Sequence, residues 1–424
     1  MRKMKDSGIE WIGAIPESWE TGQIGHLYDE RKEKVSDRDY PPLSVTMKGI
    51  VPQLSTAAKT DAHDDRKLVC KGDFAINSRS DRRGSCGISA YDGSVSLINT
   101  ILTPRNEMNP QYYDWLFHTT MFADEFYKWG HGIVDDLWTT NWSDMKRIAV
   151  PLPALEEQQR IAAHLDRQCA YIDNIIEKTK ASIEEYKKLR QAVITQAVTK
   201  GVRGDRTMKD SGIEWIEEIP EEWEIAKTKI IADRIVVGVV IKPADYFDEA
   251  GTVPFLRGIN IKEYSIVPEP MVYITEESNR MNSKSIIHSG DILIVRDGSI
   301  GVSCVVPPEY DGANAVSLII VTCAKNNNTY YITYSLNSDV GKVQFELMKI
   351  GTALTHTSVH SVSNIIHTIP DIEEQNEIVQ FLDQKCAEID ALIAKKETFL
   401  TELEAYKKSM IYEYVTGKKE VPSE

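Results

Sequence analysis

One phrase of fifteen residues occurs twice in this chain. Residues 6–20 read DSGIEWIGAIPESWE, and residues 210–224 read DSGIEWIEEIPEEWE. A second pattern, Pro-x-[Leu/Ile]-Glu-Glu-Gln, follows each copy of the phrase and begins at Pro153 and again at Pro370. Internal self-similarity of this kind is typical of chains built from repeated structural units. The sequence therefore predicts two diverged copies of one fold in tandem.

Length, charge and cysteine usage narrow the class of protein. A chain of 424 residues is too long for one ordinary core, so at least two domains are expected. With a net charge of −15, a nucleic-acid surface is expected either to be a local basic patch or to borrow positive charge from partner subunits. We find no apolar run long enough for a membrane span and no apolar leader, so neither a membrane segment nor a secretory signal is expected. Six cysteines without a C-x-x-C pair fit a reducing cytoplasm.

Each Glu-Glu-Gln motif begins a stretch with the signals of a long helix. Proline precedes its first turn, glutamates there complement the helix dipole, and neither glycine nor proline follows before Gly201 in the first copy. A seven-residue apolar repeat runs from Leu165 and from Leu382. Polar residues interrupt it at equivalent places, Thr179 with Lys396 and Arg190 with Lys407. An ordinary amphipathic core helix remains an alternative, but two such seams can bury each other as a coiled coil.

Between the phrase and the helix, each copy carries a body with mixed strand and helix signals. Strands are predicted over 73–78, 94–102, 291–298 and 315–322, and helices over 112–129 and 329–348. The order of these signals is similar in both copies, so both bodies are expected to be α/β domains of one fold. The predicted boundaries are 1–152 and 204–369 for the two domains, and 153–203 and 370–424 for the two helical spacers.

This arrangement resembles the specificity subunit of type I restriction–modification systems. The resemblance is carried by the repeated DSGIEWI phrase, by the Pro-x-Pro step at Pro151 and Pro153, and by the repeated Glu-Glu-Gln helix, and it covers essentially the whole chain. It implies two target recognition domains, each reading one half of a split DNA site. It also implies that the two helices pair as an antiparallel coiled coil and dock two modification (methyltransferase) subunits.

The same resemblance implies a non-catalytic, cytoplasmic chain that binds no cofactor or metal of its own. S-adenosylmethionine would be bound by the modification subunits, and ATP and Mg²⁺ by separate restriction subunits. The partners implied are therefore double-stranded DNA and these two kinds of subunit, with no membrane.

Motifs for catalysis are scarce in the sequence. Asn109-Pro110-Gln111-Tyr112 comes near the motif of adenine methyltransferases, but no glycine-rich cofactor loop precedes it, so we expect Asn109 to cap a helix. A phosphate-binding G-x-x-x-x-G-K-[ST] loop is absent from the sequence. Two alternatives stay open: a self-contained DNA methyltransferase or nuclease, and a coiled-coil adaptor that does not read DNA.

Candidate DNA contacts come from three kinds of segment, each of which could also be an ordinary solvated loop. The first kind follows a predicted strand and offers Arg79, Ser80, Arg82, Arg83, Arg296 and Ser299. The second kind, RGINIK and its counterpart TMKGI, offers Arg257, Asn260, Lys262 and Lys48. The third kind, which precedes each long helix, offers Thr139, Asn141, Thr352 and His356. Arginine can pair with guanine and asparagine with adenine, whereas Asp135 and Asp136 count against the first loop of the third kind.

The repeated tryptophans could stack on bases, but packing is the better explanation. Trp11 and Trp19 recur as Trp215 and Trp223, although the two domains are expected to read different targets. Side chains kept alike under those conditions are expected to serve the scaffold or the docking of a partner.

Overall fold

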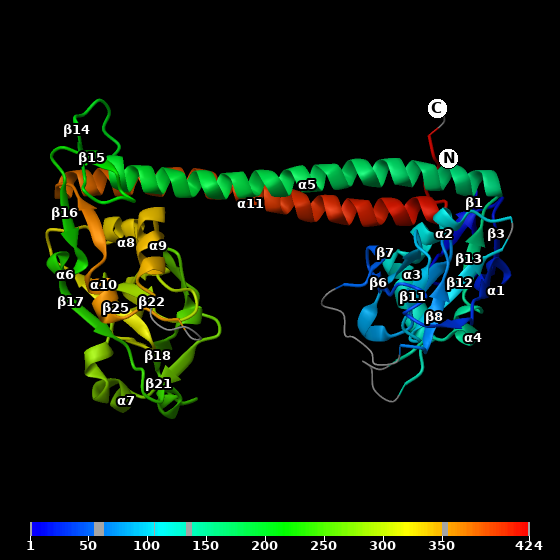
Figure 1. The fold of residues 1–424 in the computed structure, drawn as a ribbon, viewed down its shortest axis with the longest axis horizontal. Coiled ribbons are helices and arrows are strands. Elements are labelled where there is room, and N and C mark those ends of the chain that lie inside the picture. Colours follow the sequence, from blue (N-terminus) through cyan, green and yellow to red (C-terminus); the bar gives the residue numbers. More distant parts are fainter. Residues whose placement is uncertain (1, 55–62, 106, 133–137, 350–354, 423–424) are drawn as a thin grey trace. The chain divides into compact units, whose positions relative to one another are not determined.

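The computed structural model describes residues 2–54, 63–105, 107–132, 138–349 and 355–422. It divides into two compact units, which are described separately: unit 1 is Met1–Lys180 with Glu397–Glu424, and unit 2 is Ala181–Lys396. Each unit contains one α/β body and parts of both long helices (Figure 1). The predicted fold class, two α/β domains with a pair of long helices, is confirmed.

The body of unit 1 is built on a four-stranded antiparallel sheet. Its strands in order are β10 (Cys86–Ile88), β9 (Phe74–Asn77), β12 (Asn99–Pro104) and β4 (Tyr28–Glu30). A second sheet contains β11 (Gly93–Val95), β8 (Arg66–Val69) and β5 (Lys34–Val35). Three smaller pairs of strands are β6 (Leu43–Thr46) with β7 (Gly49–Pro52), β1 (Met4–Asp6) with β2 (Ala14–Pro16), and β3 (Glu20–Gln23) with β13 (Ala149–Leu152). The helices are α1 (Ile24–Leu27), α2 (Pro110–Phe117), α3 (Thr120–Lys128) and α4 (Trp142–Met145).

The body of unit 2 repeats this plan. Its main sheet runs in the order β17 (Ala232–Val237), β25 (Leu318–Cys323), β22 (Ile292–Val295) and β23 (Ser303–Val305). A second sheet contains β21 (Val272–Ile274), β18 (Val253–Leu256) and β24 (Asn314–Ala315). Three smaller pairs of strands are β14 (Met208–Asp210) with β15 (Glu218–Pro220), β16 (Glu224–Lys227) with β26 (Ile366–Ile369), and β19 (Ile261–Lys262) with β20 (Ser265–Ile266). The helices are α6 (Thr228–Ile231), α7 (Glu276–Met281), α8 (Thr329–Asn337), α9 (Asp339–Leu347) and α10 (Val359–Ser363).

Several predicted elements are interrupted in the structure. The helix predicted over 112–129 is two helices, because the Thr119 hydroxyl accepts from the backbone nitrogen of Phe122 and starts α3 anew. Ser338 does the same for α9 within the helix predicted over 329–348. The strand predicted over 315–322 breaks at Ser317, whose φ of 49° is incompatible with a continuous ladder. The element types were predicted correctly, and the breaks are set by single capping or turn residues.

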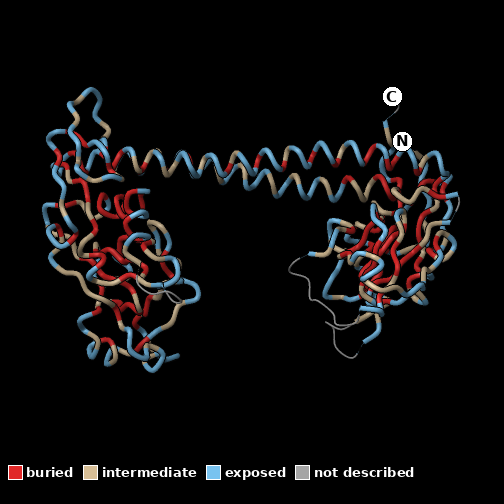
Figure 2. Tube along the Cα trace, in the orientation of Figure 1, coloured by how far each residue is buried: buried red, intermediate tan, exposed pale blue. Residues whose placement is uncertain are grey.

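The two long helices are α5 (Leu155–Lys200) and α11 (Ile372–Val415). Within unit 1 they pair antiparallel, since the His164 ring packs against the Tyr414 ring while Asp173 lies beside Lys407. Within unit 2 the pairing is again antiparallel, with Arg190 beside Asp390 and with Arg203, just after the end of α5, beside Glu377. The positions of the predicted apolar repeat are buried or half-buried along both helices (Figure 2). The predicted antiparallel coiled coil is thus present in each unit.

The repeated phrase anchors each body to the start of a long helix. In unit 1 the Trp19 indole nitrogen donates to Glu157 Oε2 at 2.8 Å, and in unit 2 the Trp223 indole nitrogen donates to Glu374 Oε2 at 3.0 Å. Both tryptophans are almost completely buried. The expectation that the repeated tryptophans pack rather than stack on bases is confirmed for Trp19 and Trp223. The phrase is repeated because each body needs the same anchor.

The glutamine of each Glu-Glu-Gln motif joins the long helix to the helical part of its body. Gln158 Oε1 accepts from the backbone nitrogen of Asn109 at 2.8 Å, and Gln375 Oε1 accepts from that of Asn328 at 2.8 Å. Asn109 in turn caps α2 by accepting from the backbone nitrogen of Tyr112, as predicted.

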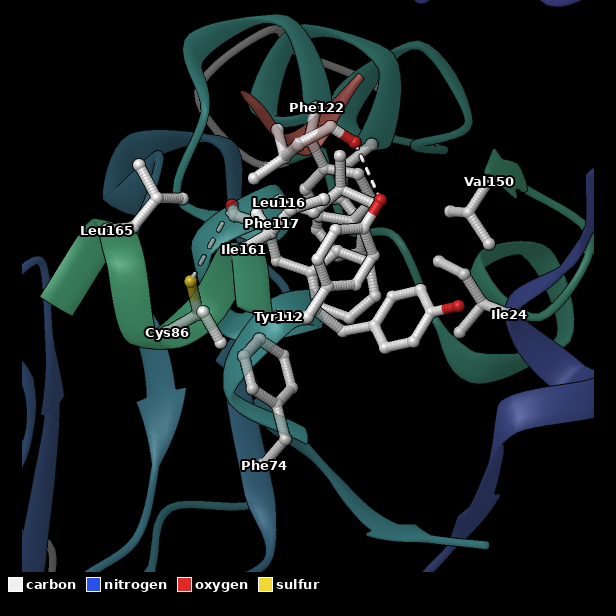
Figure 3. Close-up of a cluster of buried hydrophobic side chains, with 14 of the residues drawn as sticks. Ile24, Phe74, Cys86, Tyr112, Leu116, Phe117, Phe122, Val150, Ile161 and Leu165 are labelled. Atoms are coloured by element: carbon white, nitrogen blue, oxygen red, sulfur yellow. Dashed lines mark hydrogen bonds between the residues drawn. The ribbon is translucent and has the colours of Figure 1, made fainter. Parts of the chain in front are cut away.

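The core of unit 1 joins its sheet to both long helices. Figure 3 shows Phe74 of the sheet, Tyr112 and Phe117 of α2, and Ile161 and Leu165 of α5 in one apolar cluster. The end of α11 joins the same core, because the Tyr112 hydroxyl donates to the carbonyl of Val415 at 2.6 Å. In unit 2 the Tyr331 hydroxyl donates to the carbonyl of Val198 near the end of α5. Each body is therefore held by the start of one long helix and the end of the other.

Candidate nucleic-acid interface

One edge of the main sheet in unit 2 gathers most of that domain's candidate residues. Strand β25 lies between β17 and β22 and is antiparallel to both, so β17 and β22 end at the same edge. The loop after β22 carries Arg296 and Ser299, and it follows directly from this edge. Loops that leave the ends of strands are free to vary in sequence, and they are the usual place for recognition residues.

The loop that precedes α10 is paired with the loop after β22. The Thr357 backbone nitrogen donates to the carbonyl of Arg296 at 3.0 Å, and Asp297 and His356 form an antiparallel bridge. Two segments that were singled out separately in the sequence, and that are far apart along the chain, thus form one surface. Arg296 is half-buried and lies 3.9 Å from the Asp297 carboxylate, whereas Ser299 is exposed. Thr352 lies outside the described residues.

Arg257 reaches the same edge from β18. Beside it, Gly258 lies so close to the end of β22 that a Cβ there would meet Val295 Cγ1 at 3.4 Å and the Asp297 carbonyl at 3.8 Å. The Arg257 Nη2 donates to the carbonyl of Pro270 at 2.8 Å, which holds the half-buried guanidinium in place. Arg257, Arg296 and His356 therefore belong to one edge, called here the unit 2 recognition edge.

Unit 1 forms the equivalent edge with the same contacts. The Thr140 backbone nitrogen donates to the carbonyl of Ser78 at 3.0 Å, and Arg79 and Thr139 form an antiparallel bridge. The Ser80 backbone nitrogen also donates to the carbonyl of Trp138 at 3.0 Å. The loop after β9 and the loop before α4 are therefore paired, as their counterparts are in unit 2. We call this surface the unit 1 recognition edge.

The unit 1 recognition edge is locally basic although the whole chain is acidic. Arg79, Arg82 and Arg83 are exposed, and Arg79 forms no ion pair with another residue in the described part of the chain. Arg82 lies 3.5 Å from Asp81, and Arg83 lies 2.8 Å from Asp124 and over the ring of Tyr127. Exposed ion pairs of this kind contribute little free energy, so phosphate can displace their carboxylates.

One predicted contact residue, Asn260, is contradicted by the structure. Its side chain is 0% exposed, its Oδ1 accepts from the backbone nitrogen of Arg257 at 3.0 Å, and its Nδ2 donates to the carbonyl of Val267 at 3.0 Å. A saturated, buried amide cannot pair with adenine. Asn260 instead shapes the turn that presents Arg257, a role that the residue type and its loop position did not reveal.

Three other candidates are exposed but serve different local roles. Asn141 caps α4 by accepting from the backbone nitrogen of Ser143 at 2.9 Å. Lys48 lies in the turn between β6 and β7. Lys262 lies in the β19–β20 hairpin, whose turn residue Tyr264 packs under the Arg190 guanidinium of α5. Unlike Thr139 and His356, none of these three takes part in the pairing of the loops.

The segment that follows β17 was not predicted as part of the site. Gly238 donates to the carbonyl of Leu318 at 2.8 Å, so residues 238–242 also leave the sheet at the unit 2 recognition edge. The available signal was the run of aliphatic residues that ends in Lys242-Pro243, which reads as a strand that stops at a turn.

No helix in the described ranges is both long and apolar enough to cross a bilayer.

The chain is similar in sequence to known specificity proteins of type I restriction systems. The model of the family described as the type I restriction modification DNA specificity domain matches residues 16–185 and again residues 220–402. The MjaVIII specificity subunit of a type I restriction enzyme from Methanocaldococcus jannaschii is 25% identical over 419 residues, covering 95% of this chain and 93% of that protein. The EcoBI specificity subunit from Escherichia coli is 28% identical over 255 residues, which is 57% of this chain and 52% of that protein.

Solved structures show the same fold. A chain from a study of complex assembly and conformational transition in the type I R-M system has a TM-score of 0.75 at 14% identity, covering 96% of this chain and 99% of that one. The HsdS subunit from Thermoanaerobacter tengcongensis has a TM-score of 0.53 at 16% identity, covering 96% of this chain and 98% of that one. Because the family model matches both halves of the chain, at the two bodies and the helices that follow them, the chain belongs to the type I restriction modification DNA specificity family.

Proposed function

We propose that this chain recognises a split DNA target, one half with each recognition edge, on behalf of methyltransferase subunits. The observation that carries the proposal is the pairing of two loops in each unit, Ser78 with Thr140 and Arg296 with Thr357. Equivalent backbone contacts support two recognition surfaces of the same construction, while the side chains on them differ. Two readers of common design and different sequence suit a target with two different halves.

The chemistry of each edge suits DNA. Arginine can bind guanine bidentately or hold a phosphate, and Arg79, Arg82 and Arg83 supply this chemistry in unit 1. In unit 2, Arg257 and Arg296 are half-buried, and the Pro270 carbonyl holds the Arg257 guanidinium, which favours a base contact that needs a fixed geometry. Thr139 and His356 occupy the same place in the paired loops and add polar contacts of different kinds.

The partners follow from the family rather than from a bound molecule. The nearly symmetric ends of the two helices suit two equivalent docking positions, so two modification subunits are proposed. S-adenosylmethionine would be bound by those subunits, and ATP and Mg²⁺ by restriction subunits. This chain binds none of them and performs no catalysis. A cytoplasmic location is proposed on the same basis.

The proposal is tested by mapping methylated bases in a methylation-free host that carries this chain with its modification subunit. The expected result is a split motif, with two short fixed blocks around a fixed unread gap. A continuous motif, or methylation that does not depend on this chain, would overturn the proposal. Binding of S-adenosylmethionine by the isolated chain would instead favour a self-contained methyltransferase.

A paired substitution assigns one block of the motif to unit 1. In Arg82→Ala/Arg83→Ala, recognition of one block should weaken by roughly ten- to a hundred-fold, the scale of a lost bidentate base contact, while the other block is unchanged. Arg105→Ala is the matched control, because Arg105 follows β12 at the opposite end of the same sheet and its side chain is exposed. An unchanged motif in the double variant would favour the adaptor alternative.

A further inference from the structure

The unit 2 recognition edge exposes two isoleucines that packing does not explain. Ile241 is 78% exposed, which is the highest value for a large apolar side chain among the described residues, and Ile259 is 55% exposed. Single exposed apolar residues are common on protein surfaces. Here two of them lie on one small edge, beside two arginines and a histidine. This combination suits a ligand that has both polar groups and an apolar part.

Backbone hydrogen bonds bring both isoleucines to this edge. Residues 314–317 form a run with a parallel neighbour on each side: Val239 bridges Val316, and Leu256 pairs with Ala315. The Ser317 nitrogen donates to the Val239 carbonyl at 3.1 Å, and the Val316 nitrogen donates to the Leu256 carbonyl at 2.7 Å. The two flanking runs therefore leave the ladder in the same direction, and they lead directly into Ile241 and Ile259.

The spacing of the two runs fits one half of a DNA target. Neighbouring strands lie about 4.8 Å apart, so runs separated by one strand are roughly 10 Å apart. Base pairs stack at about 3.4 Å, so this separation corresponds to roughly three base-pair steps. Both isoleucines can thus reach one short block of bases.

The backbone holds Ile241 in one position. Lys242 adopts a left-handed conformation with φ of 43°, and Pro243 follows it at the start of a short 3-10 turn. A non-glycine residue in that region is strained by about 1 kcal/mol or more, and proline removes freedom from the chain. The branched side chain of isoleucine is itself stiff at its first torsion. An exposed apolar side chain fixed in this way is suited to a contact that depends on shape.

The major groove of DNA offers one apolar group for such a contact, the 5-methyl group of thymine. We propose that Ile241 and Ile259 recognise thymine 5-methyl groups in the half-site read by unit 2. This inference rests on the proposed function, since it assumes that the unit 2 recognition edge faces DNA. Arg257 and Arg296 would supply the polar contacts around these methyl groups.

The experiment uses the complex of this chain with its modification subunit and a duplex that carries the mapped target. Each thymine of the unit 2 half-site, on either strand, is replaced singly by deoxyuridine, which removes the methyl group and keeps the base pairing. At one or two positions, the substitution should weaken binding by about four-fold, the effect of one buried methyl group. In Ile241→Ala or Ile259→Ala the same substitution should have no further effect at the corresponding position.

Ile230→Ala is the matched control. Ile230 is 70% exposed and lies just before β17, at the end of that strand opposite to Ile241. This variant should keep the full preference for thymine over deoxyuridine. The inference is overturned if the wild-type complex binds every deoxyuridine duplex as well as the thymine duplex, or if the half-site contains no A·T pair. It is also overturned if the alanine variants bind both duplexes more weakly than wild type by the same factor, so that the preference for thymine over deoxyuridine is kept. A split motif together with any of these results would leave the proposed function standing, whereas no split motif would remove both.

Discussion

Arg190 of α5 lies 2.9 Å from Asp390 of α11 in unit 2, and Lys407 of α11 lies 2.6 Å from Asp173 of α5 in unit 1. Asp173 and Asp390 stand at the same distance from the Glu-Glu-Gln motifs that begin their helices, and so do Arg190 and Lys407. One ion pair has therefore been kept twice. The polar interruptions at Arg190 and Lys407, seen in the sequence as breaks in an apolar seam, are half of a repeated cross-helix contact.

Reversing one charge of this contact should destabilise unit 1 modestly. Asp173→Lys places two cations together, and Lys407→Glu places two carboxylates together. Because Asp173 is largely exposed, each single change should lower the free energy of unfolding by roughly 1 kcal/mol or less. The double variant Asp173→Lys/Lys407→Glu restores an opposite pair and should recover most of the loss. Urea denaturation of the four proteins measures this coupling, and additive losses would show that the two side chains do not interact.

The anchor of the repeated phrase should matter more in unit 2 than in unit 1. Glu374 is fully buried, accepts from Trp223 and forms an ion pair with Arg206 at 2.5 Å. Glu374→Ala leaves the indole nitrogen of Trp223 without its acceptor and leaves Arg206 with Glu222 as its remaining carboxylate, which should cost about 3 kcal/mol. The equivalent Glu157 is partly exposed and pairs with Arg2, so water can replace the lost contact.

Thermal unfolding checks this ranking. Glu157→Ala should lower the melting temperature less than Glu374→Ala does, because the partly exposed Arg2 regains hydration. Equal losses would mean that burial of the carboxylate does not set the strength of the anchor.

The sequence predicted the architecture well because its strongest signals are repeated. The phrase, the Glu-Glu-Gln helix and the order of the body elements each occur twice, so every assignment had an internal check. Breaks within elements were missed because they depend on single residues whose alternatives are close in free energy. Thr119 is compatible with a helix interior until its hydroxyl accepts from Phe122, and Ser317 is compatible with a strand until φ becomes positive.

The candidate site was predicted less completely than the fold. Arg296 and His356 were singled out separately, and the structure pairs their loops. Asn260 was misjudged and Ile241 was overlooked, for one physical reason. Residue type suggests that asparagine is exposed and isoleucine is buried, but the turns after β18 and β17 reverse this, and turn geometry depends on contacts with distant strands.

Asn260→Ala should lower stability without changing the DNA motif. The substitution removes the acceptor of the Arg257 backbone nitrogen and the donor to two carbonyls, those of Val267 and Pro270. Unpaired buried polar groups cost about 1–3 kcal/mol, so the free energy of unfolding of unit 2 should fall by that amount. Methylation mapping at a temperature where the variant is folded should return the wild-type motif. Selection of a different base at one position of the unit 2 half-site, as opposed to weaker selection of the same base, would contradict the structural role assigned to Asn260.

His367 should make unit 2 less stable in mild acid. Its ring is almost completely buried between the hydroxyls of Thr228 and Ser335, and burial lowers the pKa of His367 to about 4. The unfolded chain has the ordinary pKa of about 6.5, so between these values the unfolded state binds the extra proton. The neutral ring's contribution to the free energy of unfolding is therefore complete above pH 6.5. It is lost as the pH falls toward 4, and the total loss is about 3 kcal/mol.

His367→Gln isolates this contribution, because glutamine keeps a donor and an acceptor near the two hydroxyls and does not titrate. Urea denaturation of wild type and variant at several values between pH 7.5 and pH 4 should therefore show a smaller acid-induced loss for the variant. His360→Gln, which removes an exposed imidazole from the same unit, should follow the wild-type curve. Parallel curves for wild type and His367→Gln would mean that the ring can be protonated in the folded state without cost, and that the buried site admits water.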